Sequence, residues 1–159
     1  TLFPYTTLFR SKVFHGQFTL TRQYKAAPAN VFKALSDPAK KRRWFAEGEG
    51  FNVLKFEMDF RTGGRDYALF AFGEGPEIYN EGFYLDIREN EFISHSYAMG
   101  TSAGCFSASL LSMTFEKDGD GTNLIVTEQG AYFDDESSVR NREEGTRELL
   151  EALARELGE

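Results

Sequence analysis

The chain of 159 residues has very little cysteine or histidine: Cys105 is the only cysteine, and His15 and His95 are the only histidines. A single cysteine cannot form an intramolecular disulfide, and such cysteine usage is typical of a reducing, cytoplasmic compartment. A zinc site needs several cysteine, histidine or carboxylate ligands that converge, which this supply argues against. We therefore expect a cytoplasmic protein that folds without a disulfide, a metal ion or another cofactor.

Positive charge and long apolar runs are also scarce. The 18 Lys and Arg residues are outnumbered by 25 Asp and Glu, which gives a net charge of −7. Nucleic acids and anionic membranes both require a basic surface, and the one basic run, Lys40–Arg43, is typical of a solvated helix face. No stretch approaches the roughly 20 apolar residues of a membrane span. The composition thus argues against nucleic-acid binding and against a membrane span.

The common signatures of catalysis are missing as well. The sequence contains no nucleophile elbow, no Walker loop and no dinucleotide-binding glycine fingerprint. No nucleophile is paired with a base in any motif, so we assign no catalytic residue.

Aromatic residues, by contrast, are abundant. Sixteen Phe, seven Tyr and one Trp make up 15% of the chain. Rings of this size either fill a core or line a cavity. The length corresponds to one domain, and a domain of this size buries about 68–70% of the surface of its unfolded chain. The positions of the aromatic residues along the chain therefore have to show whether they fill a core or line a pocket.

The hydrophobic pattern predicts an α+β domain. Residues 17–24 alternate as in a strand, Pro28 suits the first turn of a short helix that Asp37-Pro38 ends, and a second short helix is expected at about Ala39–Phe45. Six further strands are expected at 52–60, 66–72, 79–88, 91–98, 107–116 and 122–130, before a long helix that reaches the end of the chain. Short turns between successive strands favour an antiparallel order. We expect a seven-stranded antiparallel curved sheet wrapped around the C-terminal helix.

The last helix has an unusual inward face. It is apolar only from Leu149 onward, whereas its first half carries Arg142, Glu143, Gly145 and Thr146. A glycine costs about 1 kcal/mol of helix propensity relative to alanine, so Gly145 either approaches another group closely or is a tolerated surface residue. Strand aromatics facing this polar half would leave a pocket between the sheet and the helix.

Five short motifs occur in an order that resembles a known family. They are Ala27–Pro38 followed by Trp44-Phe45, Arg61–Gly64, Gly82–Ile87, Thr127–Gly130 and Arg142–Gly145. Together they resemble START-like (SRPBCC, helix-grip) domains, in the branch similar to the activator of heat-shock-protein-90 ATPase, over about Phe18 to Leu157. The resemblance implies the helix-grip fold. The branch often carries Trp where this chain has Thr146, and a smaller residue there would enlarge or reshape the cavity.

The first eleven residues, TLFPYTTLFRS, lie outside this resemblance. They lack the basic start and the apolar run of a signal peptide. Over their whole length they resemble the translation of a widely used sequencing adapter. We expect residues 1–11 to be an adapter-derived artefact, residues 12–16 a leader remnant, and residues 17–159 a single START-like domain.

Polar residues of the predicted site have two interpretations each. His95 could hydrogen-bond a ligand or act as a base, or it could be a core histidine paired with strand groups. Arg142 on the helix, and Glu128 and Gln129 on the facing strand, either meet a ligand or form ion pairs, with Arg142–Glu128 and Arg142–Glu143 as the two candidate pairs.

Apolar residues complete the site. The resemblance implies that Trp44 and Phe45 lie at the cavity mouth, although a packing anchor would explain them too. The predicted ligand-binding set is Trp44, Phe45, Phe56, Phe72, Tyr84, His95, Tyr97, Gln129, Arg142 and Gly145.

Three functions are compatible with these features. The first is a binding protein for a hydrophobic, apolar or aromatic small molecule held between sheet and helix. The second is an interaction module that presents its sheet to a protein partner, a chaperone ATPase, although the resemblance implies a two-domain chain for the full activator. The third is a cyclase- or hydrolase-type enzyme on the same fold. The missing nucleophile–base pair disfavours the enzyme, and we predict small-molecule binding.

Overall fold

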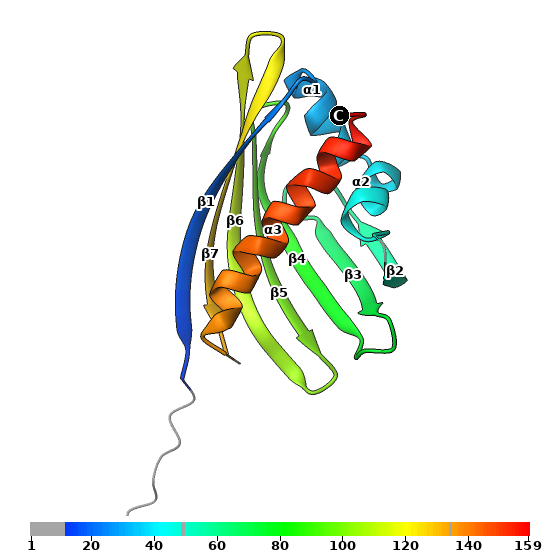
Figure 1. Ribbon diagram of the computed structural model, residues 1–159, viewed down its shortest axis with the longest axis vertical. Coiled ribbons are helices and arrows are strands. Elements are labelled where there is room, and N and C mark those ends of the chain that lie inside the picture. Colours follow the sequence, from blue (N-terminus) through cyan, green and yellow to red (C-terminus); the bar gives the residue numbers. More distant parts are fainter. Residues whose placement is uncertain (1–11, 49, 134) are drawn as a thin grey trace, which may run out of the picture.

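The structure is a computed structural model that describes residues 12–48, 50–133 and 135–159, so the predicted adapter-derived segment 1–11 lies outside the described residues. Within this part, the elements in chain order are β1 (Phe14–Tyr24), α1 (Pro28–Ser36), α2 (Pro38–Phe45), β2 (Phe51–Met58), β3 (Arg65–Phe72), β4 (Ile78–Arg88), β5 (Phe92–Thr101), β6 (Gly104–Asp118), β7 (Gly121–Tyr132) and α3 (Ser137–Glu156). A curved sheet wraps around α3 (Figure 1). The predicted α+β, helix-grip architecture is confirmed.

The seven strands form one antiparallel sheet in the order β1-β7-β6-β5-β4-β3-β2. The first strand crosses over to pair with the last, and β2 forms the far edge. β1 begins at Phe14, which pairs with Tyr132, so residues 14–16 of the expected leader remnant belong to the strand. Tight turns join the long strands: Asn90 and Gly119 adopt positive φ angles of 62° and 58° in the β4–β5 and β6–β7 turns. This backbone conformation favours asparagine and glycine.

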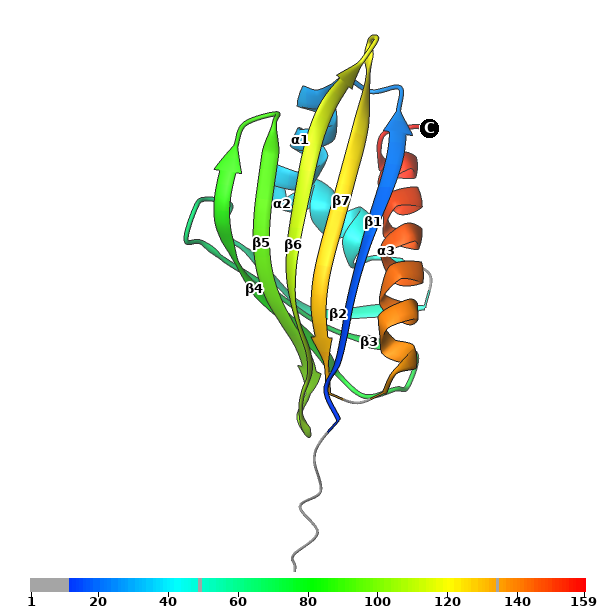
Figure 2. The ribbon, with the colours of Figure 1, turned by 90° about the vertical axis from the view of Figure 1, so that its left-hand side faces the viewer.

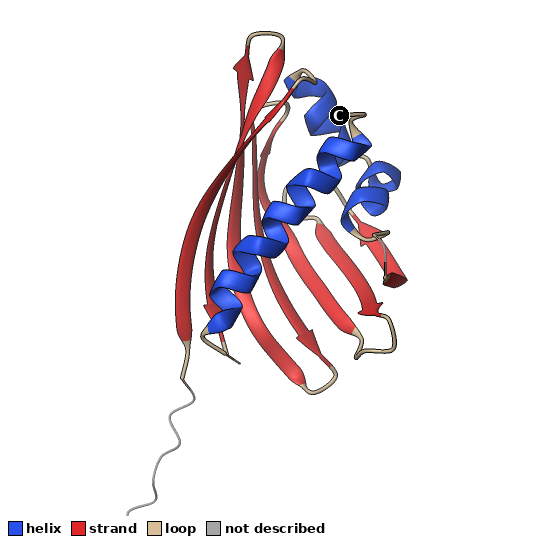
Figure 3. Cartoon of the chain, in the orientation of Figure 1, coloured by secondary structure: helices blue, strands red, loops and turns tan. Residues whose placement is uncertain are grey.

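Both predicted short helices are present, and the second begins at Pro38, one residue before its expected start at Ala39. Pro28 occupies the first turn of α1. Asp37 ends α1 and caps α2, since its carboxylate accepts hydrogen bonds from the backbone N–H groups of Ala39 (3.0 Å) and Lys40 (3.2 Å). All three helices lie on the same side of the sheet (Figure 3).

The hydrophobic core lies where α1 and the C-terminal half of α3 meet the sheet. Val31, Leu124 and Leu153 are fully buried there, and the Tyr24 hydroxyl donates a hydrogen bond to the Leu150 carbonyl oxygen across 2.8 Å. Figure 2 views the outer face of the sheet, with α1 and α2 behind it. The core thus anchors only one half of α3, and the other half faces the site described next.

No helix in the described ranges is long and apolar enough to cross a membrane.

Candidate functional site

A cavity of about 570 Å³ lies between the inner face of the sheet and α3. Small-molecule sites commonly enclose about 300–1,000 Å³ behind mainly apolar walls. Here the walls are mainly apolar, with aromatic rings contributed by α2, the sheet and the connections between elements. These rings include Trp44, Phe45, Phe51, Phe60, Phe70 and Phe72.

The polar first half of α3 leaves this space open. Gly145 lines the cavity, and a Cβ atom added to it would meet no atom within 4 Å from the rest of the described chain beyond its own stretch of helix. The neighbouring Thr146 also lines the cavity, and its hydroxyl donates to the Arg142 carbonyl oxygen across 2.9 Å. Neither residue has a side chain long enough to fill the space between helix and sheet.

One wall of the cavity is an ion pair that ties α3 to the sheet. The Arg142 guanidinium lies 3.0 Å from a carboxylate oxygen of Glu128, whose side chain is only 1% exposed. The guanidinium also donates to the hydroxyls of Tyr97 (2.8 Å), Ser107 (2.7 Å) and Ser109 (3.2 Å). Of the two candidate pairs, the structure therefore forms Arg142–Glu128. Burial, together with the Glu128 carboxylate, raises the pKa of Tyr97, which keeps its hydroxyl protonated.

The surface residue Glu143 takes no part in this network. Its carboxylate pairs instead with Arg147 one helical turn later, across 3.0 Å.

A second polar group inside the cavity joins α2 to β3 and β4. The Lys41 ammonium donates to the Asp66 carboxylate and to the Tyr84 hydroxyl (3.1 Å), and that hydroxyl donates to Asp66 across 2.9 Å. Burial by itself would raise the pKa of Asp66, but the Lys41 ammonium outweighs it and holds that pKa below its usual value. The pair is therefore charged at neutral pH.

Sequence reasoning missed Lys41 and Asp66. The basic run was interpreted as a solvated face, yet the Lys41 side chain is only 12% exposed. Two signals were available: Lys41 stands four residues before Phe45, hence on the same helix face, and Asp66 alternates with Ala68 and Phe70 along the inner face of β3.

His95 lies between the two polar groups and is 7% exposed. Its ring stacks on Tyr97 (centroids 5.8 Å apart) and contacts the Tyr84 ring (4.9 Å). Among the described residues, its buried Nε2 atom has no hydrogen-bond partner, and it lies 3.8 Å from an Asp66 carboxylate oxygen. A Cβ atom added to Gly82 would come within 2.6 Å of this imidazole, so the glycine is what allows the ring to lie here.

Burial, reinforced by the Lys41 ammonium, lowers the pKa of His95 to about 4. The imidazole is therefore neutral at physiological pH. One interpretation of this residue was a core histidine paired with strand groups. The Nε2 atom does not fit it, because no described strand group forms a hydrogen bond with this nitrogen.

This buried, neutral histidine makes stability depend on pH. An unfolded histidine takes up a proton near pH 6.5, whereas His95 in the folded protein does so only near pH 4. Protonation therefore favours the unfolded chain in this window, and we expect the free energy of unfolding to fall by about 2 kcal/mol between pH 7 and pH 5. Urea unfolding at the two pH values measures this loss.

Two variants separate His95 from other titrating groups in that experiment. His95→Phe should remove most of the pH dependence between pH 7 and pH 5, while His15→Gln, at the exposed histidine, should leave it in place. An equal pH dependence in the wild type and in His95→Phe would contradict the assignment.

The cavity brings together eight of the ten predicted site residues: Trp44, Phe45, Phe72, Tyr84, His95, Tyr97, Arg142 and Gly145. Trp44 is also an anchor, because its indole N–H donates to the Ala34 carbonyl oxygen of α1 across 2.8 Å. Whether these residues bind a ligand stays a prediction.

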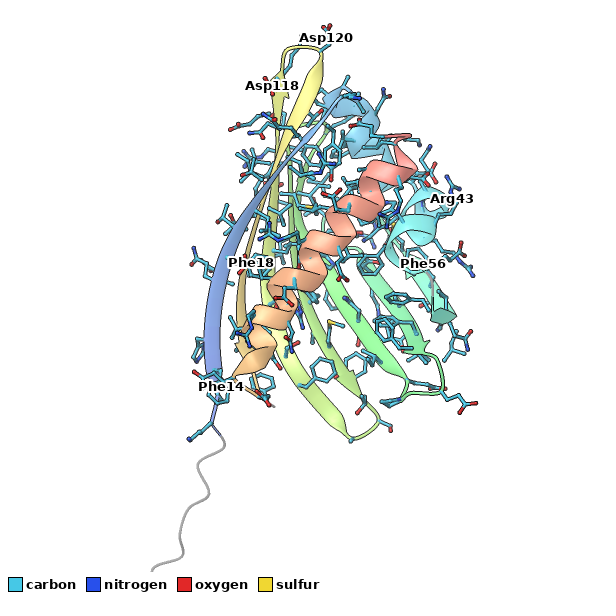
Figure 4. The ribbon with its side chains drawn as sticks, viewed as in Figure 1. Phe14, Phe18, Arg43, Phe56, Asp118 and Asp120 are labelled. Carbon is cyan, nitrogen blue, oxygen red and sulfur yellow. The ribbon has the colours of Figure 1, made fainter. Side chains whose placement is uncertain are left out.

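The other two predicted residues lie outside the cavity lining. Phe56 lies on β2, the edge strand farthest from β1 (Figure 4). It follows a bulge between Val53 and Lys55 that shifts the register of this strand against β3. Gln129 is exposed on the outer face and donates to Gln17 across 3.2 Å, since strand alternation turns it away from the inward-facing Glu128.

Metal ligands do not gather in this site. Within the part of the chain that the structure describes, no group of three or more His, Cys, Asp or Glu side chains is placed to hold a metal ion.

Comparisons with known proteins agree with this architecture. A family model described as "Activator of Hsp90 ATPase homolog 1-like protein" matches residues 25–158. A crystal structure of a protein from Rhizobium loti is 44% identical, with a TM-score of 0.84, over 91% of this chain and 99% of that one. A protein from Rhizobium leguminosarum is 33% identical, with a TM-score of 0.87, over 92% and 97% of the two chains.

A more distant structure, from Chromobacterium violaceum, is 27% identical, with a TM-score of 0.75, over 87% of this chain and 94% of that one. No curated protein matches the chain.

Proposed function

Because the chain belongs to the family of Activator of Hsp90 ATPase homolog 1-like proteins, we propose that it is a binding protein whose cavity holds an apolar or aromatic small molecule. The observation that carries this proposal is the cavity of about 570 Å³ with aromatic walls. Protein interiors are close-packed, and voids larger than a water molecule are few. A space of this size between sheet and helix is therefore suited to a ligand rather than to core packing.

The way the walls are held supports the same function. Tyr97 and Arg142 are fixed by hydrogen bonds to Glu128, and Tyr84 by hydrogen bonds to Lys41 and Asp66. A ligand would thus enter a site whose polar walls are already ordered, which reduces the entropy lost on binding.

A neutral fluorescent probe tests this proposal. We expect N-phenyl-1-naphthylamine to bind the native protein saturably with one probe per chain, because the aromatic walls exclude water from its rings. A fluorescence titration at pH 7 measures the binding, and an excess of unlabelled phenanthrene should displace the probe. Fluorescence that rises only in partly denaturing urea would show that the probe binds exposed core surface and would contradict the proposal.

The outer face of the sheet supports a second candidate function, the binding of a protein partner. Phe83 and Leu85 of β4 and Leu110 of β6 are 46%, 50% and 44% exposed. Ser96 of β5 pairs in register with both Phe83 and Leu110, so a small residue separates the exposed apolar side chains. Exposed apolar side chains grouped in this way are typical of interaction surfaces.

An ATPase assay tests the second function, since the family description refers to an activator of the Hsp90 ATPase. If the outer face binds this chaperone, the wild-type protein should raise its rate of ATP hydrolysis. The double variant Phe83→Ser/Leu110→Ser should lose the effect. An unchanged rate in the presence of the wild-type protein would rule this partner out.

A further inference from the structure

The charges inside the cavity compensate one another. Lys41 is paired with Asp66, and Arg142 is paired with Glu128. His95 is held neutral by its burial. The two other charged residues of the lining, Glu148 and Arg155, are exposed and of opposite sign. Among the described residues of the lining, no charge of either sign is therefore left over to neutralise a charged ligand.

A charged group would also meet a like charge near His95. A carboxylate there would approach Asp66, whose carboxylate oxygen lies 3.8 Å from the imidazole Nε2. An ammonium group would approach Lys41, which contacts the same carboxylate. Either group would have to give up its hydration without gaining a counter-ion, which is costly in a buried site.

A neutral polar group, in contrast, needs no counter-ion, and the imidazole beside this part of the cavity carries a nitrogen whose hydrogen-bonding capacity is unused. His95 lines the cavity, and only 7% of its surface is exposed. Its Nε2 atom has no hydrogen-bond partner among the described residues. An unpaired buried nitrogen is unfavourable, so a ligand that satisfies it gains affinity. A hydroxyl group suits either neutral tautomer of the imidazole, because it can donate as well as accept.

We infer that the ligand of this cavity is uncharged and carries a hydroxyl group on an apolar, ring-like body, with the hydroxyl bound to His95. This inference rests on the proposed small-molecule function. Since Nε2 is covered by protein atoms, the hydrogen bond requires the imidazole to turn toward the cavity that it lines. The aromatic walls contact the body of the ligand, and the two ion pairs exclude charged analogues.

Three probes that share one ring system test the inference: 2-naphthol, 2-methylnaphthalene and 2-naphthoate. Calorimetric titration at pH 7 gives the dissociation constant of each. We expect 2-naphthol to bind about fivefold more tightly than 2-methylnaphthalene, because one hydrogen bond between neutral groups increases affinity by about this factor. We expect 2-naphthoate to bind at least about tenfold more weakly than 2-methylnaphthalene, because its charge finds no partner.

His95→Phe removes both ring nitrogens and retains a ring that can stack on Tyr97. In this variant the advantage of 2-naphthol should disappear, while 2-methylnaphthalene should bind within about twofold of its wild-type affinity. His95→Gln, which keeps a hydrogen-bonding group, should retain part of the advantage and serves also if the Phe variant does not fold. The control Phe72→Leu alters an apolar wall and should change the affinity of all three probes alike.

The outcomes separate this inference from the proposed function. Three results would each overturn the inference and leave small-molecule binding intact. The first is equal affinity for 2-naphthol and 2-methylnaphthalene, and the second is an advantage of 2-naphthol that persists in His95→Phe. The third is that 2-naphthoate binds most tightly of the three. If none of the three probes binds and N-phenyl-1-naphthylamine also fails, the proposed function itself is wrong.

Discussion

Arg142→Met is expected to lower the free energy of unfolding by about 3–5 kcal/mol, the range observed when one partner of a buried ion pair is removed. The methionine keeps much of the length of the side chain but leaves the Glu128 carboxylate, 1% exposed, without its counter-ion. The hydroxyls of Tyr97, Ser107 and Ser109 lose their donor at the same time. Urea unfolding at pH 7 measures the loss.

A double-mutant cycle shows whether the pair is the cause. Glu128→Gln removes the uncompensated charge, so the double variant Arg142→Met/Glu128→Gln should be more stable than Arg142→Met alone. Arg147→Met is the matched control, because Arg147 on the same helix is exposed and, among the residues that the structure describes, forms its ion pair with Glu143. It should change stability by less than about 0.5 kcal/mol. A small effect of Arg142→Met would mean that the guanidinium is not needed to hold α3 on the sheet.

Gly145→Leu is expected to weaken binding of N-phenyl-1-naphthylamine by more than about tenfold while the protein becomes more stable. A side chain at this position enters open space in the cavity, since an added Cβ meets no atom within 4 Å from the described residues outside its own stretch of helix. Replacing a helical glycine with leucine also gains up to about 1 kcal/mol of helix propensity. Opposite changes in affinity and stability distinguish a blocked cavity from a damaged fold.

The control for this variant is Glu144→Leu, which adds the same side chain at the neighbouring exposed position of α3. It should leave probe affinity unchanged. Fluorescence titration gives the affinity and thermal unfolding gives the stability of each variant. Equal probe binding by Gly145→Leu and the wild type would show that the ligand site does not extend to this part of the helix.

Much of the fold could be predicted because its signals are local. Alternating strands, the short turns between them, and the Asp37-Pro38 pair that ends the first helix are each visible within a few residues of sequence. The leucines of the last helix likewise marked its core-facing half, where Leu150 and Leu153 are buried. The order of the strands in the sheet is not determined by local patterns. It was expected from the family resemblance of the five motifs.

The candidate site was predictable only in part, because side-chain direction depends on register and on neighbours distant in sequence. Gln129 was expected to face inward, and the pairing of β7 turns it outward. Lys41 and Asp66 are 25 residues apart, and no local pattern shows that they meet. For Arg142, the sequence allowed two partners, and the crossing of α3 over β7 selects Glu128.

By itself the sequence determined the class of elements, their order, the polar half of the last helix and the acidic, cysteine-poor character of the chain. These properties depend on residue type and on spacings of two to four positions, which a chain carries whether or not it is folded. Only the tertiary structure decided that Lys41 pairs with Asp66 and Arg142 with Glu128 inside the cavity, and that the Nε2 atom of His95 between them has no hydrogen-bond partner in the described part of the chain. The physical reason is that burial and ion pairing arise from contacts between segments far apart in the chain, and those contacts exist only once the sheet has curved around α3.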